Sequence, residues 1–213
     1  MSPKVVDKVS RRREIALAAL DLFADKGFEG TSMSQIAKAC DISKGGIYLY
    51  FASKDDLIQQ AVGVWIETFL DDVGQEVDAQ QPPDERLRSL VCSMVQFFMP
   101  EQRSLKIAAA IFQLYVTNPE LWNRYALADE LFSGARKTIA DILLEGVSQG
   151  IFLPELAKDA EKTAINLVAF LDGIALHYYM SKGSFDLRGQ VDQYLDMLLK
   201  SAMAPRGQRG AAQ

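Results

Sequence analysis

The sequence predicts an all-α protein, and three observations lead to this prediction. Apolar residues recur at the three- and four-residue spacing of helices along most of the 213 residues, and strand-like alternation is nearly absent. Gly and Pro fall between the periodic blocks, where helices begin and end. A content of 49% apolar and 24% charged residues is typical of a globular chain with a sizeable core.

Three short helices are predicted near the N-terminus. The first spans residues 10–26. Ser32 and Gln35 have the spacing of a capping box and open the second helix, which runs to about residue 40. Asp41 occupies a tight bend, and a very short helix follows over residues 44–50.

The rest of the sequence predicts longer helices and divides the protein into two domains. The expected ranges of these helices are 53–77, 84–99, 102–117, 119–149, 159–182 and 187–203. We expect an N-terminal domain over residues 1–56 with a basic arm, and a larger helical domain over residues 57–204. We expect a disordered tail over residues 205–213, because this segment has too little apolar surface to order itself.

The second and third helices, with the four-residue bend between them, form a helix-turn-helix pattern. In this pattern the second helix of the pair lies in the major groove of DNA and presents its first residues to base edges. The residues predicted to read bases are Ser43, Lys44, Gly45 and Gly46, with Ser34 and Gln35 on the preceding helix. The residues predicted to bind phosphates are Tyr48, Tyr50 and Lys54. The two glycines remove side chains where the helix would approach DNA most closely.

Charge is distributed unevenly along the chain. The net charge of −5, from 23 Lys and Arg and 28 Asp and Glu, argues weakly against a nucleic-acid binder. Residues 1–56, however, hold nine Lys and Arg and eight Asp and Glu, a net charge of +1, whereas residues 57–213 hold fourteen and twenty, a net charge of −6. The first 13 residues hold five Lys and Arg and one Asp, which suits an arm that binds phosphates or a minor groove. A solvated basic N-terminus is the alternative.

These features make the first part of the chain resemble the DNA-binding domain of TetR-family transcriptional regulators. The resemblance covers residues 13 to about 62, including the run LFADKGFEGTSMSQIAKACDISKGGIYLYFASKDDL. The matching positions are Phe23, Gly27, Phe28, Thr31, Ile36, Ala37, Ile42, Ser43, Tyr48, Tyr50, Phe51, Lys54 and Leu57. The resemblance implies an all-α homodimer with an N-terminal three-helix DNA-binding domain and a larger C-terminal helical ligand-binding and dimerisation domain.

The resemblance also implies which residues contact DNA. The positions that do so in the family correspond here to Ser32, Ser43, Lys44, Gly45, Tyr48, Tyr50 and Lys54. The sequence departs from the family pattern at Asp41, where Gly is usual, and at Gly45 and Gly46, where larger residues are common. Beyond residue 77 the resemblance is architectural, so it predicts neither the operator sequence nor the ligand.

The last two predicted helices resemble the pair that forms the dimer interface in this family, a four-helix bundle across a two-fold axis. Small residues allow close helix approach, and an apolar stripe supplies the contact. The residues predicted to form this interface are Ala169, Gly173, Val191, Leu195 and Leu198. Such a stripe is also typical of an intramolecular core, but two DNA half-sites favour a two-fold dimer.

Aromatic residues concentrate in the middle helices and predict a cavity for a small apolar or aromatic effector. The residues predicted to line it are Phe98, Phe112, Tyr115, Trp122, Tyr125, Phe170 and His177. The alternative is that they belong to the core, as aromatic residues at helical spacing and lone histidines usually do.

The predicted function is therefore a sequence-specific, DNA-binding transcriptional repressor that an effector releases from its double-stranded operator. Its expected partners are the operator, a second copy of the chain and a small molecule of unknown identity. The helix expected over residues 53–77 is the natural lever between the domains. Two alternatives remain, a dimeric DNA-binding regulator without an effector and a helical small-molecule carrier.

Residue types that other functions require are missing from the sequence. A single His, with no catalytic Cys–His arrangement, metal-ligand cluster or phosphate-binding loop, leads us to expect no enzymatic activity, metal or cofactor. Cys40 and Cys92 lie in apolar helical patterns and are expected to be reduced thiols. We expect no signal peptide and no membrane span, and hence a cytoplasmic protein.

Overall fold

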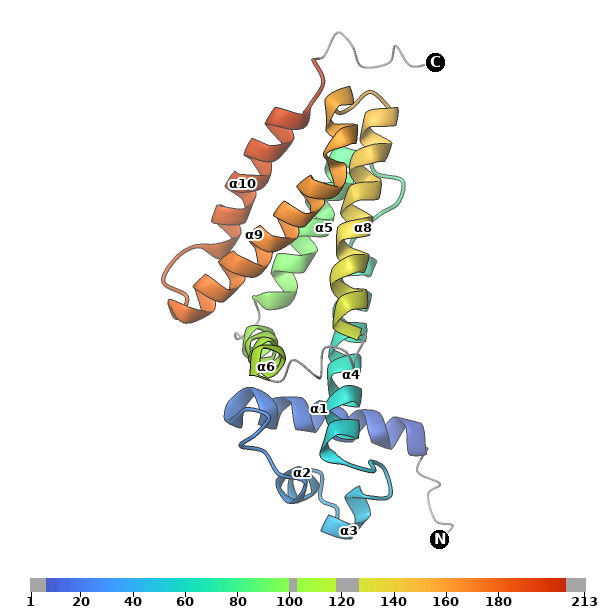
Figure 1. Ribbon diagram of the computed structural model, residues 1–213, viewed down its shortest axis with the longest axis vertical. Coiled ribbons are helices and arrows are strands. Elements are labelled where there is room, and N and C mark those ends of the chain that lie inside the picture. Colours follow the sequence, from blue (N-terminus) through green and yellow to red (C-terminus); the bar gives the residue numbers. More distant parts are fainter. Residues whose placement is uncertain (1–6, 100–102, 118–126, 206–213) are drawn as a thin grey trace. The chain divides into compact units, whose positions relative to one another are not determined.

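The computed structural model describes residues 7–99, 103–117 and 127–205, and the backbone alone for residues 115 and 127–132 (Figure 1). Within these ranges the chain is helical, apart from turns, loops and one isolated β-bridge between Phe152 and Met203. The all-α fold class that the sequence predicts is confirmed.

The helices form two compact units. Unit 1 takes its described residues from 1–69 and 103–127, and unit 2 from 70–102 and 128–213. This division differs from the predicted boundary at residue 56, because α4 (Lys54–Gln75) runs without interruption past that position and contributes to both units. It also assigns α6 (Arg103–Thr117) to unit 1, since α6 packs on α1 (Lys8–Lys26). Of the tail predicted over residues 205–213, only Pro205 lies within the described residues.

Unit 1 is built on the apolar face of α1. This helix begins two residues before the predicted start, where the Asp7 carboxylate accepts a hydrogen bond from the Val9 N–H at 3.1 Å. Its buried residues recur at helical spacing and are Ile15, Ala16, Ala19, Leu20 and Phe23. The Phe23 ring stacks on Phe28 with 4.5 Å between centroids. Burying one side chain of this size stabilises a fold by about 1.5–3 kcal/mol.

The contact between α6 and α1 has an apolar centre and charged edges. Ile107 and Leu114 of α6 are buried, and the Arg103 guanidinium binds the Asp21 carboxylate at 2.6 Å. An exposed ion pair of this kind contributes little to stability, so the apolar contacts hold the two helices together.

The loop between α1 and α2 (Met33–Ala39) is fixed by one buried hydroxyl group and two glycines. Gly27 ends α1 with φ +73°, a backbone conformation that favours glycine. The buried Thr31 hydroxyl lies 2.8 Å from the Gly27 carbonyl and donates to it. A β-carbon on Gly30 would lie 2.3 Å from the Lys26 carbonyl oxygen, so only glycine fits there.

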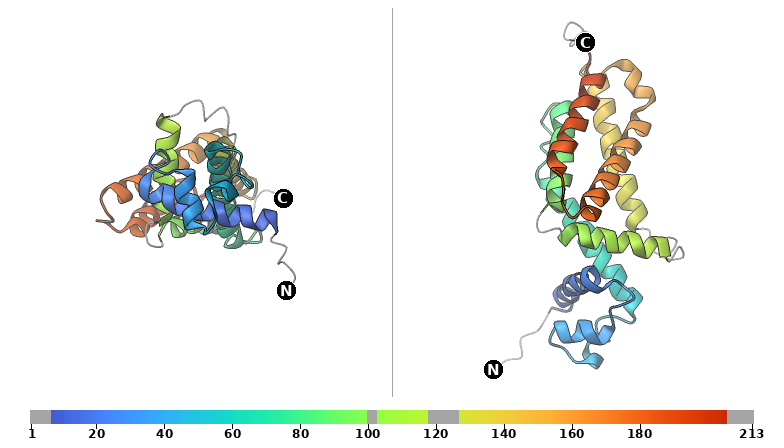
Figure 2. Two further views of the ribbon diagram at one scale, coloured as in Figure 1. Left: turned by 90° about the horizontal axis from the view of Figure 1, so that it is seen from below. Right: turned by 90° about the vertical axis from the view of Figure 1, so that its left-hand side faces the viewer.

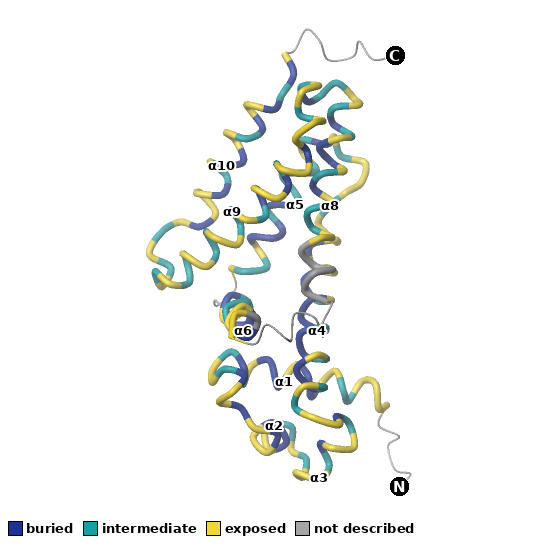
Figure 3. The backbone as a smooth tube through the Cα atoms, in the orientation of Figure 1, coloured by how far each residue is buried: buried dark blue, intermediate teal, exposed yellow. Residues whose placement is uncertain are grey.

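Unit 2 is a layered group of longer helices. It contains α5 (Pro83–Phe98), α8 (Leu127–Ser148), the 3₁₀ segment η2 (Pro154–Lys158), α9 (Ala160–Met180) and α10 (Leu187–Ala202). Figures 1 and 2 show α10 lying beside both α5 and α9, in agreement with their contacts. Buried residues recur along α5 and α10, whereas on α9 they are confined to Ala160, Ala164 and Leu167 in its first half (Figure 3).

The loop that follows α8 is held in place by the packing of Phe152 against α8 and by backbone pairing with residues 203–204. A β-carbon on Gly146 would lie 2.2 Å from the fully buried ring of Phe152, so the glycine makes room for this ring. Residues 203–204 pair with the loop after α8, and the Ala204 N–H donates to the Ile151 carbonyl at 2.9 Å.

The helix ends agree with the predicted ranges to within a few residues, with two differences. Two consecutive residues with positive φ follow α9, Lys182 (φ +55°) and Gly183 (φ +73°), so the non-glycine Lys182 also adopts a conformation that favours glycine. The predicted start of the long helix at residue 119 lies outside the described residues, and α8 is described from Leu127.

Candidate DNA-binding site and effector region

The first helix of the helix-turn-helix begins and ends with well-defined caps. The Ser32 hydroxyl accepts a hydrogen bond from the Gln35 N–H at 3.3 Å, and the Gln35 side chain accepts one from the Ser32 N–H at 2.7 Å. This is the predicted capping box. At the other end, the Ile42 N–H donates to the Ala37 carbonyl at 3.0 Å across a left-handed Asp41. The sharp bend is therefore made by the backbone, with Asp at a position that favours glycine.

The bend leads directly into α3 (Lys44–Ile47), which is one helical turn long. The Ser43 hydroxyl caps this turn by accepting a hydrogen bond from the Gly46 N–H at 2.9 Å. Ile47 and Phe51 are fully buried and anchor the turn in unit 1. One face of α3 is therefore held by the core, which fixes the direction of the other face.

Most of the predicted DNA-binding residues lie on that outward face. Ser43, Lys44 and Gly45 are exposed, Gly46 is partly covered, and the Tyr48 side chain is 49% exposed. The residues predicted on the preceding helix, Ser32, Ser34 and Gln35, are also exposed, and Tyr50 and Lys54 are half-buried. A β-carbon on Gly45 would meet only the Ser43 hydroxyl at 4.0 Å, so nothing inside the protein requires glycine there.

Sequence reasoning missed one residue on this surface. Leu49 is 73% exposed between Tyr48 and Tyr50, although its side chain is large and apolar. An exposed leucine beside a DNA-reading helix can contact a thymine methyl group. The helical spacing in the sequence could have predicted this exposure. Ile47 and Phe51 lie on the buried face, and Leu49 lies on the opposite face.

The described part of the basic arm predicted over the first 13 residues is helical from Lys8. It belongs to α1, and three of its arginines bind within unit 1. Arg11 donates to the Cys40 carbonyl at 2.8 Å, Arg12 donates to the Tyr50 carbonyl, and Arg13 binds Glu67 at 2.6 Å. The three arginines are therefore neither a free DNA-binding arm nor a solvated basic N-terminus, because helix formation turns their side chains back onto the protein.

The residues predicted for the dimer interface occupy two different environments. Ala169 and Gly173 are exposed on α9, and a β-carbon on Gly173 would meet nothing within 4 Å. Val191 and Leu195 are buried on α10, which contacts both α5 and α9, so within the protomer they belong to the core. For these two residues the protomer agrees with the alternative interpretation, an intramolecular core, and their part in a dimer stays a prediction. Leu198 is half-buried.

Several exposed apolar residues of unit 2 that sequence reasoning did not select lie on one face of α9, and others lie elsewhere in the unit, at Leu70, Met99 and Leu144. Ile165, Leu176 and Met180 follow the same helical face as Ala169 and Gly173, and the Met180 side chain is 71% exposed. Met197 on α10 is 64% exposed. The surface formed by these α9 residues and Met197 is called the α9 stripe below.

The predicted effector residues do not lie in one environment. Phe98 contacts Phe97 in unit 2, with 5.5 Å between ring centroids, whereas Phe112 is exposed on α6 of unit 1. Phe170 stacks on Tyr194 of α10 at 3.8 Å, and the exposed His177 packs against Phe185 at 5.5 Å. These last two residues therefore contribute to the packing of α9. Trp122, Tyr125 and the Tyr115 side chain lie outside the described residues.

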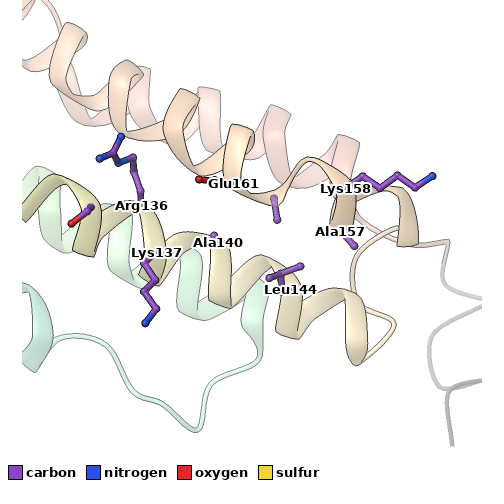
Figure 4. A pocket seen from close by; sticks show the side chains of 9 residues that line it. Arg136, Lys137, Ala140, Leu144, Ala157, Lys158 and Glu161 are labelled. Atoms are coloured by element: carbon purple, nitrogen blue, oxygen red, sulfur yellow. The ribbon is translucent and has the colours of Figure 1, made fainter. Parts of the chain in front are cut away.

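A surface groove of about 540 Å³ lies in unit 2 between α8 and the segment formed by η2 and the start of α9 (Figure 4). Its lining consists of Ser133, Arg136, Lys137, Ala140, Leu144, Ala157, Lys158, Ala160 and Glu161. The side chains of Lys137 and Lys158 point away from each other, so these charges do not converge on one ligand group. None of the predicted effector residues lines this groove.

Burial changes the pKa of three groups. Asp172 lies on the exposed side of α9, yet partial burial of its carboxyl group raises its pKa to about 6. Partial burial also raises the pKa of the Cys40 and Cys92 thiols, which lowers their thiolate fraction and hence their reactivity. Both cysteines are free thiols.

The described residues offer neither a metal-ligand cluster nor a membrane-spanning helix. Within residues 7–99, 103–117 and 127–205, no group of three or more His, Cys, Asp or Glu side chains could hold a metal ion. No helix in the described part of the chain combines the length and the apolar character needed to cross a membrane.

Together, the capped α2, the left-handed bend and the exposed face of α3 define a helix-turn-helix DNA-binding protein. Comparison with known families narrows this class. A family model described as bacterial regulatory proteins of the tetR family matches residues 15–61, and one described as the C-terminal domain of BetI-type transcriptional repressors matches residues 83–200. The chain belongs to the TetR family of transcriptional regulators.

Relatives along the whole chain agree with this assignment. The transcriptional repressor KstR2 of Mycolicibacterium smegmatis is 26% identical over 202 residues, which are 95% of each chain. The uncharacterized regulator YfiR of Bacillus subtilis is 32% identical over 165 residues, covering 72% of this chain and 75% of YfiR.

Solved structures show the same fold. A TetR transcriptional regulator from Chloroflexus aurantiacus superposes with a TM-score of 0.80 at 20% identity, covering 93% of this chain and 98% of the other. A transcriptional regulator from Rhodococcus sp. Rha1 superposes with a TM-score of 0.74 at 26% identity, covering 92% and 100%.

Proposed function

We propose that this TetR-family regulator is a homodimeric repressor that leaves its operator when a small apolar or aromatic effector binds its C-terminal helices. The observation that carries the DNA-binding part is the outward face of α3. Its core side is fixed by Ile47 and Phe51, while Ser43, Lys44 and Gly45 remain exposed. The C-terminal family model, which describes transcriptional repressors, supports repression.

On DNA, the exposed residues divide into two roles. Ser43, Lys44 and the two glycines lie at the start of α3, the part of a recognition helix that meets base edges in the major groove. Ser34 and Gln35 on α2 are further candidates for base contacts. Tyr48, Tyr50, Lys54 and Ser32 carry hydroxyl or ammonium groups that can donate to phosphates. An effective repressor needs both groups, because phosphate contacts position the protein and base contacts give specificity.

The α9 stripe is the proposed dimer interface. Small residues at Ala169 and Gly173 allow a second helix to approach closely, and Leu176, Met180 and Met197 supply apolar surface that is exposed on the protomer. A two-fold dimer would place two copies of α3 in successive major grooves, about 34–36 Å apart. A bacterial regulator of this kind would act in the cytoplasm, where its operator lies.

Effector release follows from a change in that spacing. An effector that binds more tightly to a conformer with the wrong spacing shifts the population away from DNA. α4 is the proposed lever, since it begins two residues before Asp56 in unit 1 and ends in unit 2. The preference for an apolar or aromatic effector rests on the aromatic residues of the C-terminal half.

The first test is recovery of the DNA that the protein binds across its genome, followed by gel-shift titration of a recovered duplex. Lys44→Ala and Tyr48→Ala should each weaken the shift at least tenfold and leave the melting temperature within about 2 °C, because both side chains are exposed. A wild-type protein that binds every duplex equally would refute sequence-specific regulation. Genes beside the recovered sites would then supply effector candidates, and each must weaken the shift to support induction.

A further inference from the structure

We propose that Arg12 is a positioning residue for operator binding, which fixes the end of the recognition helix to the beginning of α4. This inference rests on the proposed DNA-binding function. It concerns a residue that the sequence places in a basic arm but that the structure holds against three parts of unit 1.

The Arg12 guanidinium makes three contacts at once. One nitrogen donates to the Tyr50 carbonyl in the turn that follows α3, and another lies 3.2 Å from the Asp56 carboxylate on α4. Its central carbon lies 4.5 Å from the centre of the Phe51 ring, within the range of a cation–π contact. The side chain is 29% exposed, so these contacts are partly shielded from water.

Asp56 continues the connection to the backbone. Its other carboxylate oxygen accepts a hydrogen bond from the Ala52 N–H at 2.9 Å, and its own N–H donates to the Ser53 hydroxyl at 3.1 Å. Arg12 and Asp56 thus hold both ends of the segment 50–56, which joins α3 to α4. The last carbonyls of a helical turn lack helical partners, and the arginine satisfies one of them.

The position of this clamp gives it a functional consequence. Two candidate phosphate contacts lie close to it: Tyr48 is two residues before Tyr50, and Lys54 is inside the segment 50–56, two residues before Asp56. A phosphate pair on DNA is rigid, so the protein groups that bind it must keep a fixed separation. Arg12 sets that separation while its own guanidinium is engaged inside the protein.

The side-chain type matters as much as the charge. The planar guanidinium presents several N–H groups in a fixed fork and stacks on an aromatic face, which lysine cannot do. Arg12→Lys therefore keeps the positive charge and removes the clamp. Arg13→Lys is the matched control on the same turn, because Arg13 makes a single exposed ion pair with Glu67 at 2.6 Å.

The test compares two duplexes. One is selected by the wild-type protein from a randomised pool, and the other is a scrambled sequence of the same composition. Arg12→Lys should weaken binding to the selected duplex about tenfold, the loss expected for one charge-assisted hydrogen bond. Its affinity for the scrambled duplex and the salt dependence of that affinity should not change, because the charge is retained. Arg13→Lys should bind both duplexes as the wild type does.

A second variant separates positioning from stability. Asp56→Asn removes the same ion pair from the other side, and the double variant should lose no more affinity than either single variant. All titrations are run well below each melting temperature, so that loss of folded protein does not contribute. Additive losses in the double variant, equal losses on both duplexes, or unchanged binding by Arg12→Lys would each overturn the inference. A wild-type protein that selects no duplex would instead refute the proposed function itself.

Discussion

Gly45→Ala is expected to make the protein more stable and a weaker DNA binder. The new β-carbon would lie 4.0 Å from the Ser43 hydroxyl, an ordinary contact distance, and would touch nothing else nearby. Replacing a helical glycine by alanine stabilises a helix by up to about 1 kcal/mol, and near the first turn we expect about 0.5 kcal/mol. For a chain of this size that corresponds to a rise in melting temperature of about 1–2 °C.

The effect on DNA has the opposite sign. Gly45 is exposed at the start of α3, where a recognition helix comes closest to the bases. A methyl group in a well-packed contact costs about 1–3 kcal/mol when the surroundings must shift, which is a loss of roughly tenfold to a hundredfold in affinity. Scanning calorimetry and gel-shift titration of the selected duplex measure the two effects on the same preparation.

Two further glycines serve as controls. A β-carbon added at Gly74 on α4 would also lie more than 4 Å from any neighbouring atom, so Gly74→Ala should raise stability and leave DNA binding unchanged. Gly46→Ala places its β-carbon 3.1 Å from the Ser43 hydroxyl that caps α3, so it should lower stability as well as affinity. If Gly45→Ala bound the selected duplex as tightly as the wild type, close approach of DNA at Gly45 would be refuted.

Three other predictions concern the dimer, pH and salt. Gly173→Leu should convert the dimer to a monomer in sedimentation without lowering protomer stability, since the site is open on the protomer; a dimer that persists would exclude Gly173 from the interface. Because the pKa of Asp172 is raised from 3.8 to about 6, folded protein binds more protons than unfolded protein between these values, and stability should fall as pH rises through this window and then level off. Asp172→Asn should remove that fall in urea titrations, and an unchanged pH profile would contradict it. The slope of log affinity against log salt should be about −2 for the two Lys54 side chains that a dimer places on phosphates, and a slope of about −7 would mean that Arg11, Arg12 and Arg13 also bind phosphates.

Local signals made the helix-turn-helix predictable in detail. The capping box of Ser32 and Gln35, the Ser43 cap and the left-handed Asp41 each involve residues within a few positions of one another. Their geometry follows from short-range hydrogen bonding, so the sequence contains the full information. The exposure of Ser43, Lys44 and Tyr48 followed from the same pattern.

Long-range contacts account for what could not be predicted. Arg12 meets Tyr50 and Asp56 across 38 and 44 residues, and no local pattern indicates such partners. The packing of α6 on α1 is similar, since Arg103 and Asp21 are 82 residues apart. On α10, the period revealed an apolar stripe at Val191 and Leu195 but not whether the stripe meets α5 or a second protomer. The choice between an intramolecular and an intermolecular partner for such a stripe depends on the fold of the whole protein.

The ion pairs of Arg11, Arg12 and Arg13 reduce the positive charge that the N-terminal part of the chain can offer to DNA. Counted by residue, positions 1–56 have a net charge of +1, which suggests a weak electrostatic attraction to DNA. Counted by contact, Arg11, Arg12 and Arg13 are each paired with a carboxylate, at Glu14, Asp56 and Glu67. Among the described residues, the cations on and immediately after the recognition helix are Lys44 on α3 and Lys54 at the start of α4. Affinity for an operator must then come from the shape and hydrogen bonding of two correctly placed helices rather than from bulk charge, and this makes binding sensitive to any effector that alters their placement.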